Sequence, residues 1–115
     1  MQKTTLIPLL MLTVSGCASF ELGHDIDTSY FEQHVKRNET TQGEVLKWLG
    51  TPTSKGTVMD NTGKKYGRWV YYYGKGKLNK LSKTDIKTLE VQFEKDGTVS
   101  SYNWSASEKQ TDTAK

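Results

Sequence analysis

Few side chains in this sequence combine the residue types and the spacing that chemistry requires. His24, Asp25 and Asp27 come closest, because imidazole and carboxylate groups are metal ligands. They lie in a stretch of mixed polarity without a sustained period, so nothing fixes the geometry of a metal site. His34 is expected to be a half-exposed helix residue rather than a general base. The carboxylates form no pair of the kind that glycosidases use. We therefore expect no catalysis, no metal and no cofactor.

Cys17 is the single cysteine of the 115-residue chain, and an export signal precedes it. Lys3 is followed by an apolar run, residues 6–14, which is too short to cross a bilayer as a helix. Residues 14–17, Val-Ser-Gly-Cys, resemble the bacterial lipoprotein cleavage box. This resemblance implies cleavage before Cys17, three acyl chains on Cys17 and stable anchoring, for which about two lipid signals suffice. An ordinary signal peptide with an incidental cysteine is the alternative.

The residue after the cysteine bears on location. Ala18 stands where the enteric lipoprotein rule places the aspartate that favours inner-membrane retention. We therefore expect a lipid-anchored protein of the outer membrane that faces the periplasm, with covalent lipid on Cys17 as its only attached group.

A short helix with its own start and stop signals follows. Thr41 and Glu44 have the spacing of a capping box. Gly50 supplies a left-handed C-terminal residue, and Pro52 prevents continuation. Between these signals, apolar residues line one face: Val45, Leu46, Trp48 and Leu49. A helix this short must pack on something else to be stable.

An earlier helix is predicted from a second possible capping box, Ser29 to Glu32, and should run to about Arg37. Phe31 and Val35 would be partners one turn apart. The connection between the two helices is short, so we expect them to be neighbours and antiparallel.

The apolar period changes to two after Pro52. Strands are expected over residues 57–59, 68–73, 88–94 and 99–104, with a hairpin turn at residues 95–97. Gly74 to Lys77 is expected to end the second of these strands. The segments 53–67 and 74–86 are then long, lysine-rich loops.

These elements predict an α+β domain in which two N-terminal helices pack on a three- or four-stranded antiparallel meander sheet. The expected organisation is a signal peptide (1–16), a lipidated tether (17–29), the domain (30–105) and a disordered tail (106–115). The expected core consists of Phe31, Val35, Val45, Leu49, Leu89, Val91 and Phe93.

The ordered set of signals resembles one family. It comprises Thr41-x-x-Glu44-Val45-x-x-x-Leu49-Gly50-x-Pro52, a Trp69-x-Tyr71 strand, and Leu89-x-Val91-x-Phe93-x-x-x-Gly97-x-Val99. Over residues 40–104 these motifs resemble the BamE-like (SmpA/OmlA) outer-membrane lipoprotein domain. The resemblance implies a helix-helix-strand-strand-strand fold. Its best-known member is a non-enzymatic subunit of the machine that inserts β-barrel proteins into the outer membrane.

Two departures from the family pattern leave open whether the chain is that subunit or a paralogue. Glu39-Thr40 stands where the family often has a glycine before the capping threonine. The two lysine-rich loops are also long.

Basic residues concentrate between residues 64 and 87, where Asp85 is the one acid. They are Lys64, Lys65, Arg68, Lys75, Lys77, Lys80, Lys83 and Lys87. Solvated loops would explain them, and so would contact with anionic lipid head groups or an acidic partner. Nucleic acid is not an expected partner, because the chain is exported and its formal net charge is only +3.

Aromatic residues gather in the strand at 68–73. Alternation places Trp69, Tyr71 and Tyr73 on one face and Tyr72 on the other. One face must pack under the helices, and the other would be exposed. We take Trp69, Tyr71 and Tyr73, together with the basic residues, as candidate binding residues.

Two functions fit these features. The first is a non-enzymatic, lipid-anchored accessory protein that binds an outer-membrane or periplasmic protein and lipid, in barrel assembly or envelope maintenance. The second is a periplasmic inhibitor that caps an envelope enzyme.

Overall fold

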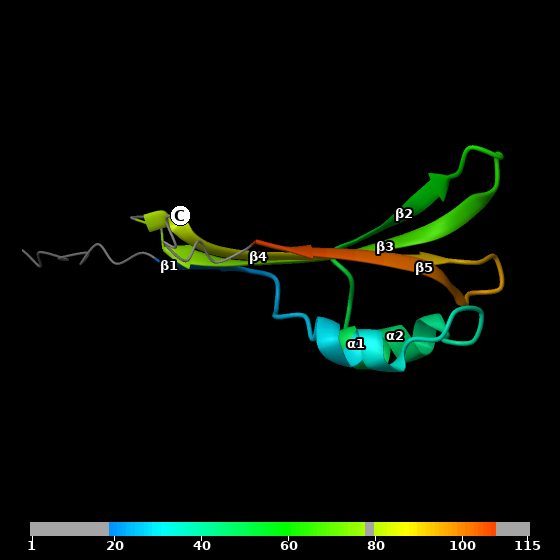
Figure 1. Ribbon diagram of the computed structural model, residues 1–115, viewed down its shortest axis with the longest axis horizontal. Coiled ribbons are helices and arrows are strands. Elements are labelled where there is room, and N and C mark those ends of the chain that lie inside the picture. Colours follow the sequence, from blue (N-terminus) through cyan, green and yellow to red (C-terminus); the bar gives the residue numbers. More distant parts are fainter. Residues whose placement is uncertain (1–18, 78–79, 108–115) are drawn as a thin grey trace, which may run out of the picture.

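A computed structural model describes residues 19–77 and 80–107 and confirms the α+β class. In the described residues, two helices and five antiparallel strands follow one another along the chain (Figure 1). They are β1 (Ser19–Leu22), α1 (Thr28–His34), α2 (Gln42–Leu49), β2 (Ser54–Met59), β3 (Lys65–Lys77), β4 (Lys80–Phe93) and β5 (Val99–Ala106). The predicted signal peptide, Cys17 and residues 108–115 of the predicted tail lie outside the described residues.

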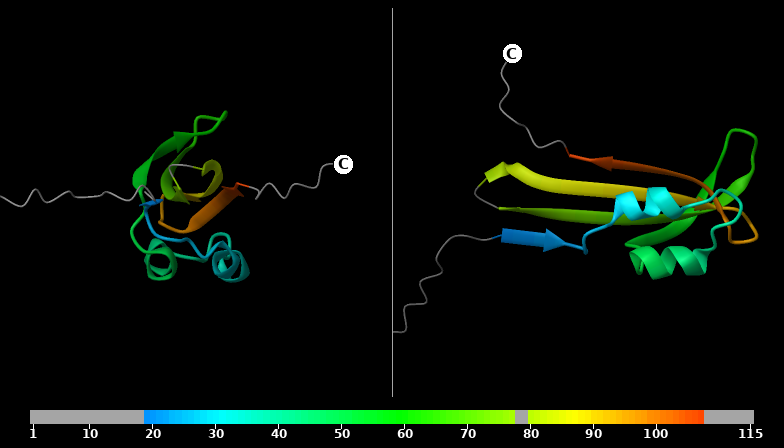
Figure 2. Two further views of the ribbon diagram at one scale, coloured as in Figure 1. Left: turned by 90° about the vertical axis from the view of Figure 1, so that its left-hand side faces the viewer. Right: turned by 60° about the horizontal axis from the view of Figure 1, so that its bottom comes forward.

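One long strand, β3, organises the sheet. Its partner on one side is β4, which in turn pairs with β5. Its other side is shared, because β2 pairs with residues 65–70 of β3 and β1 pairs with residues 74–77. The two helices lie antiparallel and side by side, and both pack on the middle part of one face of the sheet (Figures 1 and 2). The β1–β3–β4 end of the sheet extends beyond the helices as a ribbon.

The core lies between the helices and this face of the sheet. Six of the seven expected core residues are buried there, and Val35 is only partly buried. The core also contains residues that we did not predict: Ile26, Trp69, Tyr71, Tyr73 and Val99. Most of the additional residues come from β3, so this strand supplies more of the core than the sequence indicated.

The ends of α2 follow its sequence signals. The Thr41 hydroxyl accepts the Glu44 amide at 3.2 Å, the Glu44 carboxylate accepts the Thr41 amide, and Gly50 has a φ of 78°. The predicted start of α1 was wrong. Asp27, rather than Ser29, accepts the Tyr30 amide at 2.9 Å and caps the helix, which ends at His34. Both residue types can cap a helix, so spacing alone did not decide between them.

The predicted break at Gly74 to Lys77 was also wrong, because β3 runs through it and β4 begins at Lys80. A Cβ atom on Gly74 would make ordinary contact with the Tyr72 ring, at 3.4 Å. Gly76 marks a close approach of its neighbours, because a Cβ atom there would lie 2.8 Å from Thr84 Oγ1 and 3.1 Å from the Phe20 ring. Glycine inside a strand often has this role. The expected loop at 74–86 is therefore the ribbon.

The segment predicted as a tether, residues 17–29, contains strand β1. Ser19–Leu22 pairs with residues 74–77, although no period in its sequence indicates a strand. Ile26 follows it into the core, with 2% of its surface exposed. The folded domain thus begins well before residue 30, and at the other end Ser107 still donates its amide to the Ile86 carbonyl at 2.8 Å.

Candidate functional site

The three residues that could imitate a metal cluster are tied to different partners. His24 Nε2 lies 2.9 Å from the Leu49 carbonyl oxygen, and Asp27 caps α1. Asp25 forms an ion pair with Lys87 at 2.9 Å, and this ammonium group is the main reason that the pKa of Asp25 is lowered. Within residues 19–77 and 80–107, no group of three or more His, Cys, Asp or Glu residues is arranged to hold a metal ion.

The first described residue lies at the tip of the ribbon. Ser19 pairs with Lys77, the last residue of β3, and Lys77 pairs with Lys80, the first residue of β4. Figure 2 shows the ends of β1, β3 and β4 together. The described part of the chain therefore begins at the end of the sheet where β3 and β4 meet.

The basic residues that cluster in the sequence lie in two separate parts of the sheet. Lys64, Lys65 and Arg68 lie at the β2–β3 hairpin end of the sheet. The second group lies in the ribbon and comprises Lys75, Lys77, Lys80 and Lys83. From Lys65 to Lys77 the extended strand covers about 40 Å, which exceeds the Debye length of about 8 Å at physiological salt several times. Each group therefore acts separately.

The group at the hairpin end is partly neutralised. Lys64 pairs with Glu94 at 3.0 Å, and Arg68 pairs with Glu90 at 3.0 Å. The carboxylate of Glu94 is the main cause of the raised pKa of Lys64. Such pairing leaves less positive charge for an external anion, so this end of the sheet is the weaker candidate for binding acidic surfaces.

The ribbon carries charges of both signs in an ordered arrangement. Glu21, Lys75 and Asp85 lie side by side in register across β1, β3 and β4. Tyr73 donates its hydroxyl to Glu21 at 3.3 Å, and burial together with this carboxylate raises the pKa of Tyr73. Acids therefore accompany Lys75. Further out, the backbone register places Lys77 opposite Lys80, so two basic residues meet at the tip.

The structure contradicts an exposed surface made of Trp69, Tyr71 and Tyr73. Only 6%, 1% and 7% of the surface of these residues is exposed, and they belong to the core between the sheet and the helices. The Tyr71 hydroxyl donates to the Gly50 carbonyl at 2.9 Å, and burial raises the pKa of Tyr71 to about 12. Alternation identified the two faces of β3 correctly, but this is the face that the helices cover.

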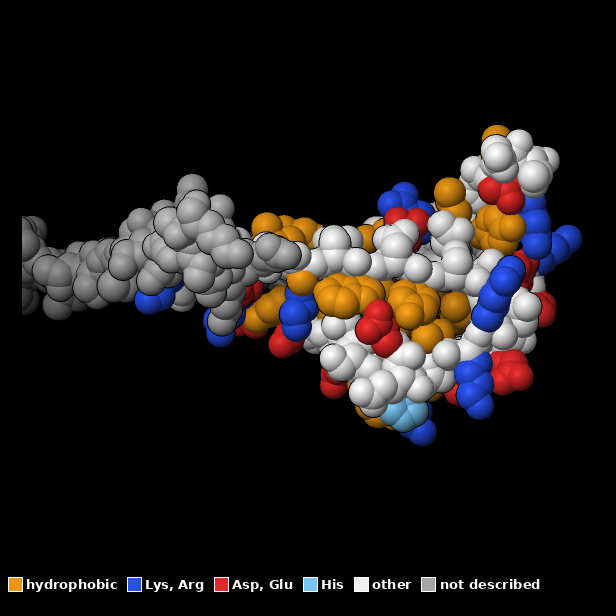
Figure 3. Space-filling view, viewed as in Figure 1, with side chains coloured by type: hydrophobic (Ala, Val, Ile, Leu, Met, Phe, Trp, Pro, Cys, Tyr) orange, Lys and Arg blue, Asp and Glu red, His pale blue; other side chains and the backbone are white. Residues whose placement is uncertain are grey.

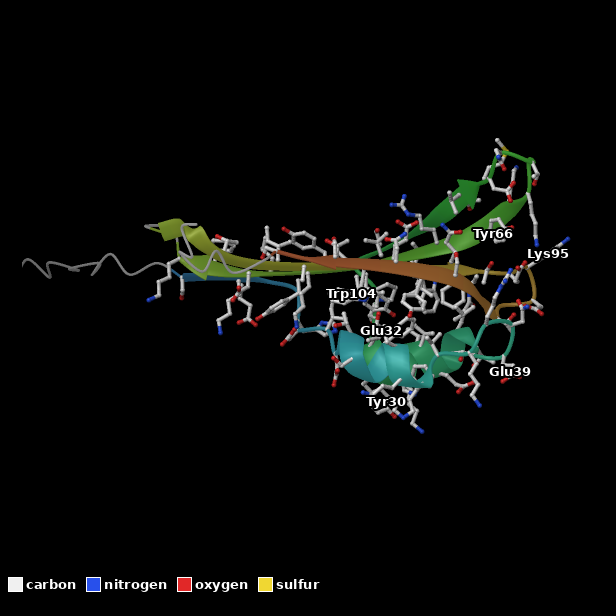
Figure 4. The ribbon with its side chains drawn as sticks, in the orientation of Figure 1. Tyr30, Glu32, Glu39, Tyr66, Lys95 and Trp104 are labelled. Carbon is white, nitrogen blue, oxygen red and sulfur yellow. The ribbon has the colours of Figure 1, made fainter. Side chains whose placement is uncertain are left out.

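Two exposed aromatic residues lie instead in β5. Tyr102 and Trp104 keep 36% and 41% of their exposure, and the Trp104 indole donates a hydrogen bond to Glu32 of α1 (Figure 4). Figure 3 shows hydrophobic side chains gathered along this boundary between sheet and helices. An open groove of about 630 Å³ adjoins them, lined by Glu32, Val35, Arg37 and residues 99–102.

The sequence carried a signal that groups Tyr102 with Trp104. Tyr102 and Trp104 are two residues apart and so share one face of a strand. What the sequence could not show is that α1 would stop short of covering them.

Comparisons of the chain with protein-family models, with curated proteins and with solved structures found no match. Among the described residues, neither helix has the length and the apolar composition needed to cross a bilayer.

Proposed function

We propose that this chain is a non-enzymatic, lipid-anchored accessory protein of the outer membrane, with a BamE-like domain that binds lipid and protein. Acylated Cys17 would hold the tip of the ribbon against the bilayer. The domain would then stand in the periplasm and bind an envelope protein, in β-barrel assembly or envelope maintenance.

The observation that carries this proposal is the pairing of Ser19 with Lys77. Because β1 is part of the sheet, an anchor at Cys17 would be attached to a defined end of a folded domain rather than to a loose tether. That end is the one with Lys77 opposite Lys80. Near an anionic surface, each lysine contributes about 1 kcal/mol of attraction, so anchor and charge would act on the same membrane.

Two measurements test the proposal. In cells, labelled palmitate should enter the wild-type chain and not Cys17→Ala. In vitro, a chain of residues 18–115 should sediment with anionic vesicles at low salt and dissociate as salt rises, because the attraction is electrostatic.

A charge-matched pair of variants separates position from net charge. Replacing Lys75, Lys77, Lys80 and Lys83 with glutamate should abolish sedimentation. The same replacement at four exposed lysines elsewhere, Lys36, Lys47, Lys65 and Lys95, should weaken it far less. Circular dichroism should show both variants folded, since exposed charges contribute little to stability. Equal loss of binding in the two variants would remove the ribbon from the proposal, and palmitate in Cys17→Ala would remove the anchor.

A further inference from the structure

Strand β5 is a long edge strand, and beyond its first residues no other strand in the described residues covers its outer side. Its eight residues, Val-Ser-Ser-Tyr-Asn-Trp-Ser-Ala, include no charged residue, no proline and no glycine. Natural edge strands are usually short or carry lysine, proline or a bulge that discourages pairing with another chain. The register of β5 shifts between Val99 and Ser101, but the pairing from Ser101 to Ala106 is regular, so the bulge does not interrupt this longer stretch. The opposite side of the sheet follows this rule, because it ends in the short strands β1 and β2.

Backbone alternation identifies the groups that point away from the sheet. Ser107 donates its amide to Ile86 of β4, so Ser101, Asn103 and Ser105 direct their backbone groups toward β4 as well. Tyr102, Trp104 and Ala106 direct theirs outward. Within residues 19–77 and 80–107, no backbone group bonds to these three on that side. They form a row of donors and acceptors that matches an extended chain.

At the start of β5, the outward backbone groups already have partners in the α1–α2 connection. The Val99 carbonyl accepts the Asn38 amide, and the Val99 amide donates to the Thr40 carbonyl, both at 2.8 Å. The connection between α1 and α2 thus covers the edge at Val99. The available stretch begins beyond it and has Trp104 at its centre.

Side chains along this edge define the chemistry of the partner. Tyr102 and Trp104 lie on the helix side, next to the groove along α1, whereas Ser101, Asn103 and Ser105 lie on the other face. A strand added here would place alternate residues against the two aromatic rings and the remaining residues beside hydroxyl and amide groups. The matching segment is uncharged and amphipathic, with an apolar residue at every second position.

We propose that β5 binds an extended, amphipathic segment of a partner protein as an added antiparallel strand. Alternating apolar and polar residues are the pattern of strands in outer-membrane β-barrels, which have unpaired edges until the barrel closes. The partner would therefore be a segment of an outer-membrane protein, and this identification rests on the proposed function.

Two other occupants fit less well. A second copy paired antiparallel through β5 would direct the two Ser19 ends, and any lipid on Cys17, in opposite directions, because β5 runs toward the ribbon tip as β3 does. The chain's own residues 108–115 contain four charged residues, Glu108, Lys109, Asp112 and Lys115, and no large apolar residue. Neither gives the amphipathic strand that the edge matches.

The test uses the mature lipoprotein in lipid nanodiscs and a short synthetic peptide of alternating valine and threonine with terminal lysines. Saturating peptide should slow amide hydrogen exchange at Tyr102, Trp104 and Ala106 by about tenfold or more, and leave Ser101, Asn103 and Ser105, already bonded to β4, unchanged. In an antiparallel pair, bonded residues have side chains on the same face. N-methylation of the valine amides should therefore abolish binding, whereas N-methylation of the threonine amides should preserve it.

A matched pair of protein variants tests the side chains. Trp104→Ala should weaken peptide binding about tenfold, because buried aromatic residues dominate such contacts. Tyr30→Ala removes an aromatic residue that is 43% exposed and lies on the far side of α1, and it should leave binding unchanged (Figure 4).

Three results would overturn the inference. The first is that the peptide slows amide exchange at no residue of β5, or equally at all of them. The second is that N-methylation of the threonine amides abolishes peptide binding and N-methylation of the valine amides does not, and the third is slow exchange at Tyr102 without peptide together with a doubled mass in light scattering. Palmitate labelling and vesicle binding could still succeed in each case, so failure here is distinguishable from failure of the proposed function.

Discussion

Two leucines of α2 provide a controlled test of how the helix packs on the sheet. Leu49 keeps 6% of its exposure and belongs to the core with Trp69 and Tyr71, whereas Leu46, one turn earlier in the same helix, is 40% exposed. Replacing either with alanine removes the same atoms. Helix propensity differs little between leucine and alanine, so the difference between the two variants reports chiefly burial.

The magnitude follows from the burial. Leu49→Ala should lower the free energy of unfolding by about 2–4 kcal/mol, the sum of lost transfer energy and the cavity left behind. Leu46→Ala should cost less than about 1 kcal/mol, since much of its side chain is already in water. For a domain of this size, the loss expected for Leu49→Ala corresponds to a fall in Tm of about 8–32 °C.

Urea unfolding followed by circular dichroism measures both variants, with m-values checked for equality so that the midpoints can be compared. If Leu46→Ala destabilises the domain as much as Leu49→Ala, the face of α2 that contacts the sheet is not the one described.

Three further predictions concern particular contacts. Tyr71→Phe removes the hydrogen bond to the Gly50 carbonyl and should lower the free energy of unfolding by about 1–2 kcal/mol. Tyr72→Phe, on the other face of β3, should lower it little, and the urea midpoints of the two variants measure the difference. The pKa values of Asp25, Asp60 and Asp96 are lowered, chiefly by Lys87, Thr62 and Thr98, so the folded state releases these protons more readily than the unfolded state. These three groups should therefore leave stability constant between about pH 5 and 9 and reduce it as pH drops below about 4, and the triple Asp→Asn variant should flatten this loss in acid urea titrations. Gly76→Val should detach β1, because the added Cβ would lie 2.8 Å from Thr84 Oγ1 and 3.1 Å from the Phe20 ring. Limited proteolysis should then cut the chain near Phe20. The control variant Gly56→Val has open space around its Cβ and should leave β1 protected from cleavage.

The sequence predicted α2 well because its signals are local. Thr41 and Glu44 are three residues apart, and Gly50 and Pro52 follow directly, so each choice depends on neighbours along the chain. The alternation of β4 between Leu89 and Phe93 is equally local, and both residues are buried.

The ribbon could not be predicted in this way. Strand β1 is stabilised by a partner more than 50 residues away, and the pairing of Phe20 with Gly76 is visible only once both strands are in place. Gly74 and Gly76 therefore indicated a turn. The lysines of the ribbon were assigned to a loop for the same reason.

The site was predicted in part. Alternation correctly grouped Trp69, Tyr71 and Tyr73, but their burial depends on where α2 docks, and the hydrogen bond from Tyr71 to Gly50 joins residues 21 apart. Exposure of Tyr102 and Trp104 depends in turn on the length of α1. Periodicity gives the faces of a strand, and tertiary packing decides which face is covered.

The most direct test of the account is the distance of each end of β3 from the membrane. If Cys17 is acylated, an engineered cysteine is the only free thiol in the mature chain. A fluorophore on Lys77→Cys or on Lys65→Cys can then be compared in vesicles that contain quencher-labelled lipid. Because about 40 Å separates the two positions along the strand, the account predicts strong quenching at residue 77 and little at residue 65. Equal quenching at both positions, or stronger quenching at residue 65, would contradict it.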